Sequence, residues 1–336
     1  MSTRIGLLFF LAMFFALGAY AQQLAENPFI RTYPNGDTLY TADPSAHVWA
    51  DGRLYVYASQ DIVPPRGCDL MDRYHVFSTD DMIRWKDHGQ ILEARNLSWG
   101  RTGGGFMWAP DCVYKDGTYY LYFPHKDDSN TWRTGVATSA EPAANFIDRG
   151  YIKGLPSGID PCVFIDDDGQ AYFYYKVNRD DAAGQKVVCA VAKLKPNMLE
   201  LDGDWSVVEG LPDYHEGPWV HKRNGIYYLT YADHNNKGHI HNRLRYAMSD
   251  SPMGPWEYKG VVVGGTTEGT QHGSIVEFKG QWYAFYHNNY LSYGKITNGC
   301  ARSICVDKLF YNEDGTMQLV VQTGLFPEIE AKNDNN

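Results

Sequence analysis

Alternating apolar and polar positions recur along the chain in short runs that end at glycine turns. Residues 219–221 alternate in this way and lead through Asn224-Gly225 into a strongly β-prone run at residues 226–231. Asn-Gly between two such runs is a strong hairpin signal. Four further hairpins turn at Asp51-Gly52, Asp116-Gly117, Asp168-Gly169 and Lys279-Gly280. Because the five copies lie roughly 50 to 65 residues apart, the pattern predicts a propeller or another repeat array.

A second pair of predicted strands follows each hairpin. This pair has a polar turn and an aromatic anchor, which is Trp85, Phe146 and Trp256 in the first, second and fourth repeats. No long helical period interrupts the pattern. The chain is therefore expected to be all-β, a five-bladed β-propeller with four antiparallel strands per blade.

Three acidic residues stand at one offset within these hairpins. Counting back nine residues from the turn glycine reaches Asp43, Asp160 and Glu216 in the first, third and fourth repeats. Strand side chains alternate between faces, so equal offsets in equivalent hairpins predict equal directions. Each acid could instead cap its own turn. Three acids in register, each close to a proline, favour convergence on one axis.

Converging carboxyl groups suit the hydrolysis of a glycosidic bond. One carboxylic acid protonates the leaving oxygen, while another carboxylate activates water or attacks the sugar. A third acid nearby raises the pKa of the donor, because like charges disfavour ionisation. Glu216 is the predicted donor because its side chain is longer and Pro218 and Trp219 flank it. Asp43 is then the base and Asp160 the modulator, although the pattern alone leaves these two roles interchangeable.

The same count reaches further candidates for the axis. It gives Trp108 in the second repeat and Gln271 in the fifth, with His272 beside Gln271. Trp108 and Gln271 are candidate substrate contacts, Trp108 by stacking on a sugar ring, with core packing as its alternative. A second histidine group lies in a polar loop and has no cysteine partner, so it is interpreted as part of a substrate rim and not as a zinc site. Its members are His234, His239 and His241.

Residues 1–21 have the pattern of a secretory signal peptide. Arg4 precedes a short apolar run, and Ala19-Tyr20-Ala21 has the form of a cleavage site. The apolar run is shorter than the about 20 residues of a membrane-spanning helix. We therefore expect an exported protein, periplasmic or secreted, in which residues 22–327 form one catalytic propeller and residues 328–336 a polar tail.

Net charge limits the classes of binding partner, and cysteine spacing limits the kinds of metal or disulfide site. The chain has 30 basic and 40 acidic residues and a net charge of −10, which disfavours nucleic acid or an anionic membrane and suits a neutral substrate. The six cysteines lack metal-site spacing, and Cys112 and Cys162 occupy equivalent strand positions as predicted core thiols. An exported protein can form disulfides, but the spacing predicts no particular pair. A monomer is expected.

Four motifs resemble those of glycoside hydrolase family 43. They are Ala42-Asp43-Pro44, Trp108-Ala109-Pro110-Asp111, Ile159-Asp160-Pro161 and Glu216-Gly217-Pro218-Trp219. The resemblance follows nearly the whole chain after the signal segment. It implies an inverting hydrolase on a five-bladed propeller, with Asp43 as general base, Asp160 as pKa modulator and Glu216 as general acid.

The resemblance also implies two supporting residues. His272 would lie under the active site near a calcium or other structural cation in the central channel, since the chemistry itself needs no cofactor. Arg302 would reach the sugar in the innermost subsite. The alternatives are a hydrogen-bonded core histidine for His272 and a structural ion pair for Arg302.

The function expected from this resemblance is an exo-acting enzyme that removes terminal α-L-arabinofuranosyl residues from neutral plant cell-wall oligo- or polysaccharide. β-Xylosidase and endo-arabinanase are alternatives on the same fold. Related β-xylosidases often carry a further C-terminal β-sandwich, so the end of this chain with its propeller favours arabinofuranosidase. Retaining fructan hydrolases need Asn-Asp-Pro-Asn, which Thr41-Ala42-Asp43-Pro44 does not supply. A sugar-binding propeller without catalysis is disfavoured because all three acids are present.

Overall fold

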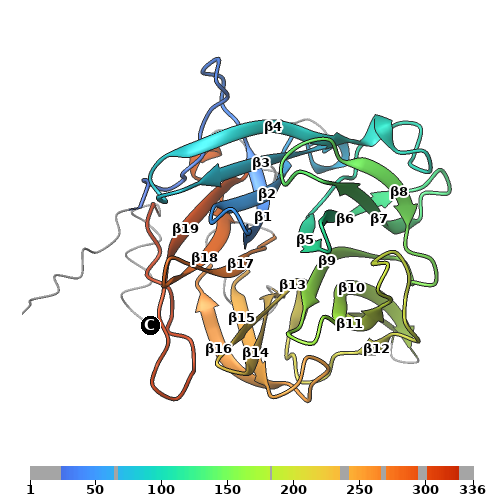
Figure 1. Ribbon diagram of the computed structural model, residues 1–336, viewed down its shortest axis with the longest axis vertical. Helices are drawn as coiled ribbons and strands as arrows, with labels where there is room; N and C mark the ends of the chain where they lie inside the picture. The colour runs from blue at the N-terminus through green and yellow to red at the C-terminus, as the bar shows by residue number, and fades with distance from the viewer. Residues whose placement is uncertain are drawn as a thin grey trace, which may run out of the picture.

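Five antiparallel sheets are arranged as blades around a central axis (Figure 1). The structure is a computed structural model that describes residues 24–63, 67–181, 184–234, 242–265, 270–293 and 301–324. The predicted five-bladed β-propeller is confirmed. The expected signal peptide, residues 1–21, and the tail, residues 328–336, lie outside the described residues.

The strands of each blade follow one another in chain order, and the first four blades have four strands each. The first blade contains β1 (Thr41–Val48), β2 (Leu54–Gln60), β3 (Arg73–Thr79) and β4 (Trp85–Glu93). The second contains β5 (Asp111–Lys115), β6 (Thr118–Lys126), β7 (Trp132–Ser139) and β8 (Ile147–Tyr151). The third contains β9 (Gly158–Ile165), β10 (Ala171–Asp181), β11 (Gly184–Leu194) and β12 (Ser206–Val207). The fourth contains β13 (Tyr214–Arg223), β14 (Ile226–Asp233), β15 (Leu244–Ser249) and β16 (Glu257–Val263).

In the described part of the chain the fifth blade has three strands. They are β17 (Ser274–Phe278), β18 (Gln281–Asn288) and β19 (Ser303–Leu309). Short 3-10 helices occur at η1 (Gly67–Leu70), η2 (Ala94–Asn96) and η3 (Tyr290–Ser292). The five hairpins predicted from the glycine turns are the first two strands of the five blades. No helix within the described ranges has the length and apolar character needed to span a membrane.

The core lies between neighbouring blades and is rich in tyrosine. Successive residues of a strand face opposite sides of their sheet. Tyr174 and Tyr175 of β10 are both fully buried and therefore pack against different neighbours. Tyr174 belongs to a cluster shared with the fourth blade, and Tyr175 to one shared with the second. This tyrosine pair thus joins the third blade to both of its neighbours.

The N-terminal segment closes the ring against the last blade. Asn27 is buried, and its amide donates to the carbonyl of Val306 and accepts from the Val306 N–H, both at 2.9 Å. The side chain of Asn27 therefore bonds the backbone of β19 as a neighbouring strand would. In addition, the Thr41 N–H donates to the carbonyl of Arg302 at 3.1 Å. This bond joins β1, the first strand of the ring, to the residue that precedes β19, the last strand.

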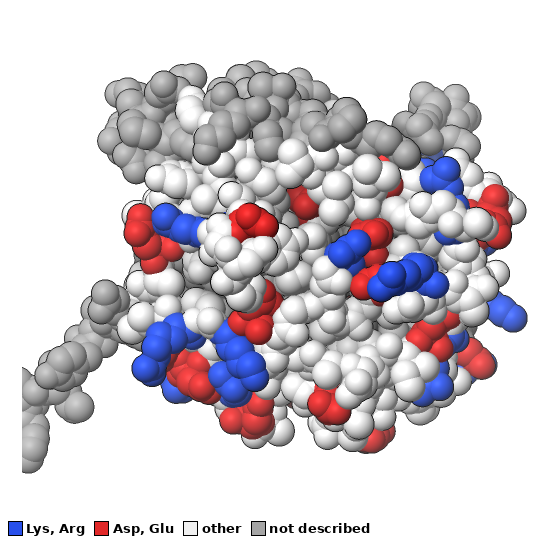
Figure 2. All heavy atoms as spheres, turned by 90° about the horizontal axis from the view of Figure 1, so that it is seen from above, with Lys and Arg blue, Asp and Glu red and all other residues white. Residues whose placement is uncertain are grey.

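Charged side chains of both signs are interspersed on the face of the molecule shown in Figure 2. Ion pairs follow the same mixed pattern, for example between Lys222 and both Asp166 and Asp167. This face has no large patch of one sign that would attract a charged polymer.

Candidate active site

The strands β1 and β9 position their aspartates by the same local device. Asp43-Pro44 opposes the single residue Ala58 of β2, and Asp160-Pro161 opposes the single residue Tyr175 of β10. Each first strand therefore has a β-bulge at its acid. The φ angles of the two aspartates are 55° and 57°, in the left-handed region that side chains with a Cβ seldom adopt. Such backbone strain persists where the surrounding structure enforces it, often at functional sites.

The strand β13 positions Glu216 differently. Its bulge is Gly217-Pro218, and Glu216 precedes the bulge, paired with Ala232 of β14. The nine-residue count predicts that the three acids occupy equivalent strand positions. This prediction is right for Asp43 and Asp160, which both lie in the bulge, and wrong by one residue for Glu216, which precedes it. The reason is the turn, because two residues join β13 to β14 while five join β1 to β2 and β9 to β10.

One pocket of about 100 Å³ brings the three acids together. Asp43, Asp160 and Glu216 line it although they are only 4 %, 3 % and 7 % exposed. The other lining residues include the apolar Met71, Ala109 and Ile159, the aromatic Trp108, and the polar or charged Thr270, His272 and Arg302. The acids come from the first strands of three different blades, so the pocket lies where these strands meet at the axis.

Arg302 bridges two buried carboxylates. Its Nη1 donates to Asp43 Oδ1 at 2.8 Å, while its Nε and Nη2 donate to the two oxygens of Asp61 at 2.9 and 2.8 Å. Burial by itself raises the pKa of Asp43, but the charge of Arg302, helped by neighbouring histidines, lowers that pKa to about 2. Asp43 is therefore ionised over the whole range in which proteins normally work. The structure supports both interpretations of Arg302, since it lines the pocket and is also part of an ion pair.

Asp160 and Glu216 form an electrostatically coupled pair. Burial, followed by the negative charge of Glu216, raises the pKa of Asp160 to about 6. Glu216 is also buried, but Lys176 Nζ lies 3.0 Å from its Oε2, and this ammonium and His215 lower the pKa of Glu216. In the protein by itself these shifts favour the protonated form of Asp160 and the ionised form of Glu216. A proton donor needs the reverse order.

Two of these groups escaped the sequence analysis. Lys176 follows the buried aromatic run of β10 at residues 171–175, and a lysine there is a signal that something must neutralise it. Asp61 follows β2 in no recognisable motif. Only the ring shows that Asp61 meets Arg302, 241 residues later in the chain.

Trp108 and Gln271, the candidate substrate contacts that the nine-residue count reaches, have different surroundings. Trp108 is half-buried on the pocket wall, where its Nε1 donates to the carbonyl of Cys68 at 2.9 Å. Gln271 is fully buried and is not part of the pocket lining. Its Oε1 accepts from the backbone N–H of His272 at 3.1 Å and of His287 at 3.3 Å. Gln271 therefore braces the wall behind the pocket and does not face it.

His272 lines the pocket and packs closely on Gly217. A Cβ at Gly217 would lie 3.1 Å from His272 Nδ1. Calcium requires six to eight oxygen ligands, and no cluster of three or more His, Cys, Asp or Glu suited to a metal ion occurs within the described ranges. The cation expected near His272 stays a prediction, in which this one histidine would contact calcium mainly through water molecules. In the second histidine group, His239 and His241 lie outside the described residues, and His234 is exposed with its ring 4.8 Å from that of His215.

The cysteines divide into two groups. Cys112 and Cys162 are buried free thiols, as predicted, and so are Cys189 and Cys305. Cys68 in η1 lines the active-site pocket and is disulfide-bonded. The disulfide therefore anchors the segment that holds the Trp108 indole.

A five-bladed propeller with three buried carboxyl groups around a central pocket defines the class of propeller glycoside hydrolases. A sequence model described as glycosyl hydrolases family 43 matches residues 37–317. The chain belongs to this family of inverting glycoside hydrolases.

Individual relatives agree with this assignment. The chain is 36% identical over 316 residues to a xylosidase/arabinosidase of Bacteroides ovatus, with 82% of this chain and 93% of the relative covered. It is 33% identical to a β-xylosidase of Xylanibacter ruminicola, covering 84% of this chain and 97% of that protein.

Among solved structures, a family 43 enzyme from Xanthomonas citri in complex with xylotriose has a TM-score of 0.74 and 36% identity, with 84% of this chain and 90% of that one covered. A β-xylosidase/α-arabinofuranosidase from a compost metagenome, in a calcium-free form with xylotriose, has a TM-score of 0.73 and 36% identity, with 84% and 94% covered.

Proposed function

We propose that the protein is an exo-acting pentosidase that removes terminal α-L-arabinofuranosyl residues from neutral plant cell-wall oligo- or polysaccharide. The observation that carries this proposal is the buried three-carboxylate pocket of about 100 Å³. Sites for drug-sized ligands usually measure about 300–1,000 Å³. A pocket this small supports recognition of one terminal sugar ring, and so disfavours an endo-acting arabinanase.

In the proposed mechanism Asp43 is the general base and Glu216 the general acid. Once the sugar is bound, the proton shared by Asp160 and Glu216 passes through Glu216 to the glycosidic oxygen, and the bond from that oxygen to the anomeric carbon breaks. A water molecule on the opposite face forms the new bond and gives its proton to Asp43. Each turnover consumes one water molecule, moves one proton from Glu216 to the leaving oxygen and one proton from the water to Asp43, and inverts the configuration at the anomeric carbon.

The remaining side chains support these roles. Arg302 keeps Asp43 ionised and fixes its orientation through two oxygens of Asp61. Asp160 stores the proton at a pKa of about 6, within reach of neutral pH. Substrate that displaces or screens the ammonium of Lys176 would raise the proton affinity of Glu216 and transfer the proton to it.

Terminal β-D-xylosyl residues are the second candidate substrate. Relatives that match over nearly their full length are named xylosidase/arabinosidase or β-xylosidase. The β-xylosidase of Xylanibacter ruminicola matches over 97% of its length, so a further β-sandwich does not separate the two activities. The argument from chain length in favour of arabinofuranosidase therefore loses its weight, and the pocket itself must be tested.

We also propose that the protein is exported as a monomer. The disulfide at Cys68 supports export, because disulfides persist in oxidising compartments. Residues 1–21 supply the corresponding signal in the sequence.

A substrate screen with product analysis tests the function. Aryl α-L-arabinofuranoside, aryl β-D-xyloside and linear arabinan are the three substrates, and we expect release of single pentose units from at least the first. Proton NMR of the first-formed anomer should show inversion. A first-formed product with retained configuration would rule out the base role of Asp43. Cleavage of arabinan at internal bonds alone, without release of single pentose units, would overturn the exo-acting proposal.

Replacing the proposed proton donor tests the role of Glu216. Glu216→Gln should lower kcat on a natural oligosaccharide by about 10²–10⁴-fold, the usual effect of losing a general acid. An aryl glycoside with a good leaving group needs less protonation, so it is the internal control and should lose less. Equal activity of the variant and the wild type on the oligosaccharide would contradict the assignment.

A further inference from the structure

A fully buried histidine of the fifth blade contacts the proposed general base. His287 of β18 is not part of the pocket lining. Its Nδ1 lies 3.2 Å from the backbone nitrogen of Asp43 and 3.5 Å from Asp43 Oδ1. On the other side of the ring, its Nε2 lies 3.0 Å from the carbonyl oxygen of Thr270. One side chain therefore connects the base in the first blade to the fifth blade.

These two contacts determine which nitrogen of His287 has the proton. A backbone N–H can only donate a hydrogen bond, and a carbonyl oxygen can only accept one. Nδ1 must therefore accept from the N–H of Asp43, and Nε2 must donate to the carbonyl of Thr270. Only the neutral ring with its proton on Nε2 does both. Burial and the charge of Arg302 lower the pKa of His287 to about 4, in agreement with a neutral ring.

The β-bulge of β1 explains why Asp43 needs an acceptor from another blade. Asp43-Pro44 opposes the single residue Ala58, and a bulge leaves its extra residue unpaired in the ladder. A buried N–H without an acceptor is unfavourable, and a left-handed backbone such as that of Asp43 persists only where its surroundings enforce it. His287 supplies the acceptor, and it thereby holds the backbone that orients the carboxyl group.

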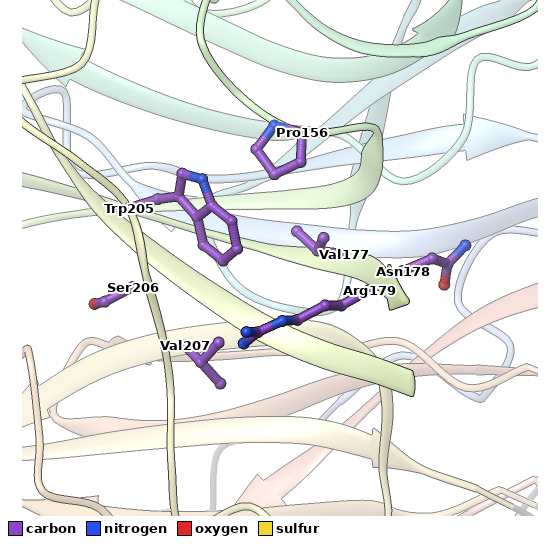
Figure 3. Close-up of a pocket in the computed structure, with 7 residues that line it drawn as sticks. All are labelled: Pro156, Val177, Asn178, Arg179, Trp205, Ser206 and Val207. Atoms are coloured by element: carbon purple, nitrogen blue, oxygen red, sulfur yellow. The ribbon is translucent and has the colours of Figure 1, made fainter. Parts of the chain in front are cut away.

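His287 occupies a position from which other polar residues also reach the acids. Counting seven residues forward from the turn glycine gives Ser59, Lys176 and His287 in the first, third and fifth blades. This count does not depend on turn length, because the residue after each glycine is the first paired residue of the second strand. Ser59 Oγ donates to Asp43, and Lys176 Nζ donates to Glu216. Residues 177–179, which follow Lys176 on β10, instead line a separate pocket on the third blade that contains no acidic residue (Figure 3).

The tautomer of His287 also matters for the basicity of Asp43. The carboxylate already accepts from Arg302 and from Ser59. A general base must keep a lone pair that can take a proton from water. A further N–H at the place of Nδ1 would donate to Oδ1 and weaken the base, whereas the unprotonated Nδ1 holds the backbone of Asp43 and leaves the carboxylate oxygen available.

We propose that His287 is a positioning residue for the reaction: its Nδ1 holds the bulged backbone of Asp43 so that the carboxylate faces the attacking water, without adding a donor to that carboxylate. This inference rests on the proposed function, in which Asp43 is the general base. His287 itself contacts neither the sugar nor the water and acts through Asp43.

Two substitutions separate the roles of the two ring nitrogens. The side-chain amide of asparagine reaches the place of Nδ1, and that of glutamine reaches the place of Nε2. His287→Gln should therefore lower kcat roughly 10²-fold while KM stays within about threefold, because the base is misplaced and the sugar site is intact. His287→Asn retains an acceptor for Asp43 and should keep kcat within about tenfold of the wild type.

His221→Gln is the matched control. His221 of β13 is also buried, its Nε2 lies 2.7 Å from the Tyr311 hydroxyl, and it does not line the carboxylate pocket. The control should keep its kcat. Wild-type kcat in His287→Gln, or a greater loss in His287→Asn than in His287→Gln, would assign His287 a structural role through Thr270 and overturn the proposal.

The choice of substrate distinguishes the base from the acid. Attack by water is needed whatever group departs, so His287→Gln should lose similar activity on a natural oligosaccharide and on an aryl pentoside with a good leaving group. Glu216→Gln should lose less on the aryl pentoside. If His287→Gln showed this second pattern, His287 would act on proton donation and not on Asp43.

Nitrogen-15 NMR of histidine-labelled protein tests the tautomer without any substrate. The signal that His287→Asn removes should have the chemical shifts of a neutral ring with its proton on Nε2 near neutral pH. A proton on Nδ1, or a doubly protonated ring, would overturn the proposal even where hydrolysis is intact. Failure of the substrate screen would instead contradict the proposed function.

Discussion

At the scale of single residues, three charges decide where the protons of the active site lie. Arg302 keeps Asp43 ionised, Lys176 favours the ionised form of Glu216, and the charge of Glu216 adds to burial in raising the pKa of Asp160 to about 6. Lys176 is therefore a positioning residue for the proton and not itself a donor.

Removing the ammonium of Lys176 tests this balance. Lys176→Met raises the pKa of Glu216, so the carboxyl group keeps its proton to a higher pH and the alkaline limb of the kcat/KM profile shifts upward. Lys222→Met is the control, because Lys222 binds Asp166 and Asp167 away from the pocket. A purely structural role for Lys176 would lower activity at all pH values without moving the limb.

The raised pKa of Asp160 should also appear in stability. A folded-state pKa of about 6, above the unfolded value of about 3.9, means that ionising Asp160 costs stability as the pH rises from about 4 to about 6. Asp160→Asn removes this cost. We expect the variant to be more stable than the wild type by roughly 1–3 kcal/mol at pH 8 and by much less at pH 4.

Denaturant unfolding of Asp160→Asn at the two pH values measures that difference. The kcat of the variant should fall, roughly 10²-fold, because the pair can no longer store the proton. A stability difference that is independent of pH would contradict a raised pKa at Asp160.

At the scale of elements, a β-bulge in each of three inner strands positions the acids. In β1 and β9 the aspartate lies in the bulge, whereas in β13 a glycine occupies that place and Glu216 comes before it. Gly217 has a φ of 63° and approaches the ring of His272. Glu216 nevertheless lines the same pocket as the two aspartates.

Gly217→Ala tests whether the bulge of β13 and the contact with His272 matter for catalysis. The left-handed backbone costs an alanine about 1–2 kcal/mol, and the new Cβ, 3.1 Å from His272 Nδ1, would force the ring to shift by a few tenths of an ångström. We expect a lower melting temperature and a fall in kcat/KM of about tenfold or more.

The matched control for this change is Gly225→Ala in the turn between β13 and β14. Gly225 has a φ of 82°, but a Cβ there meets nothing within 4 Å. The control should lose similar stability and keep its kcat/KM. Equal activity of the two variants would show that the close contact at Gly217 is unimportant.

At the scale of the whole molecule, the ring must close for the pocket to exist. The three acids come from the first, third and fourth blades, and Arg302 stands at the start of the last strand. Asn27, in the N-terminal segment, closes the ring against the last blade. Its side-chain amide donates hydrogen bonds to Val306, Asp307 and Thr323. Loss of closure therefore lowers the stability of the molecule and loosens the site at once.

Asn27→Ala should lower the free energy of unfolding by about 2–4 kcal/mol, because it leaves several buried partners unsatisfied. Urea unfolding measures this change as a lower midpoint at an unchanged slope. The exposed Asn35, which bonds Asp37, provides the control, and Asn35→Ala should stay within about 0.5 kcal/mol of the wild type. Equal midpoints for the two variants would contradict a role of Asn27 in ring closure.

The sequence by itself determined the repeat, the number of blades and the identity of the three acids. These features are local or periodic, since a hairpin is encoded by a glycine turn between two alternating runs. The resemblance of four short motifs to family 43 then gave the reaction class. The turn glycines did not give the register of Glu216, because the turns differ in length and the bulges shift the pairing.

Only the tertiary structure decided which groups set the charges of the acids. Lys176 of the third blade contacts Glu216 of the neighbouring fourth blade. Arg302, near the C-terminal end of the ring, contacts Asp61 and Asp43 near its N-terminal end. The tertiary structure also placed Gln271 behind the pocket wall, where its side chain bonds the backbone of His272 and His287. The physical reason is that electrostatic contacts depend on distance in space, which ring closure and strand bulges determine and no local pattern records.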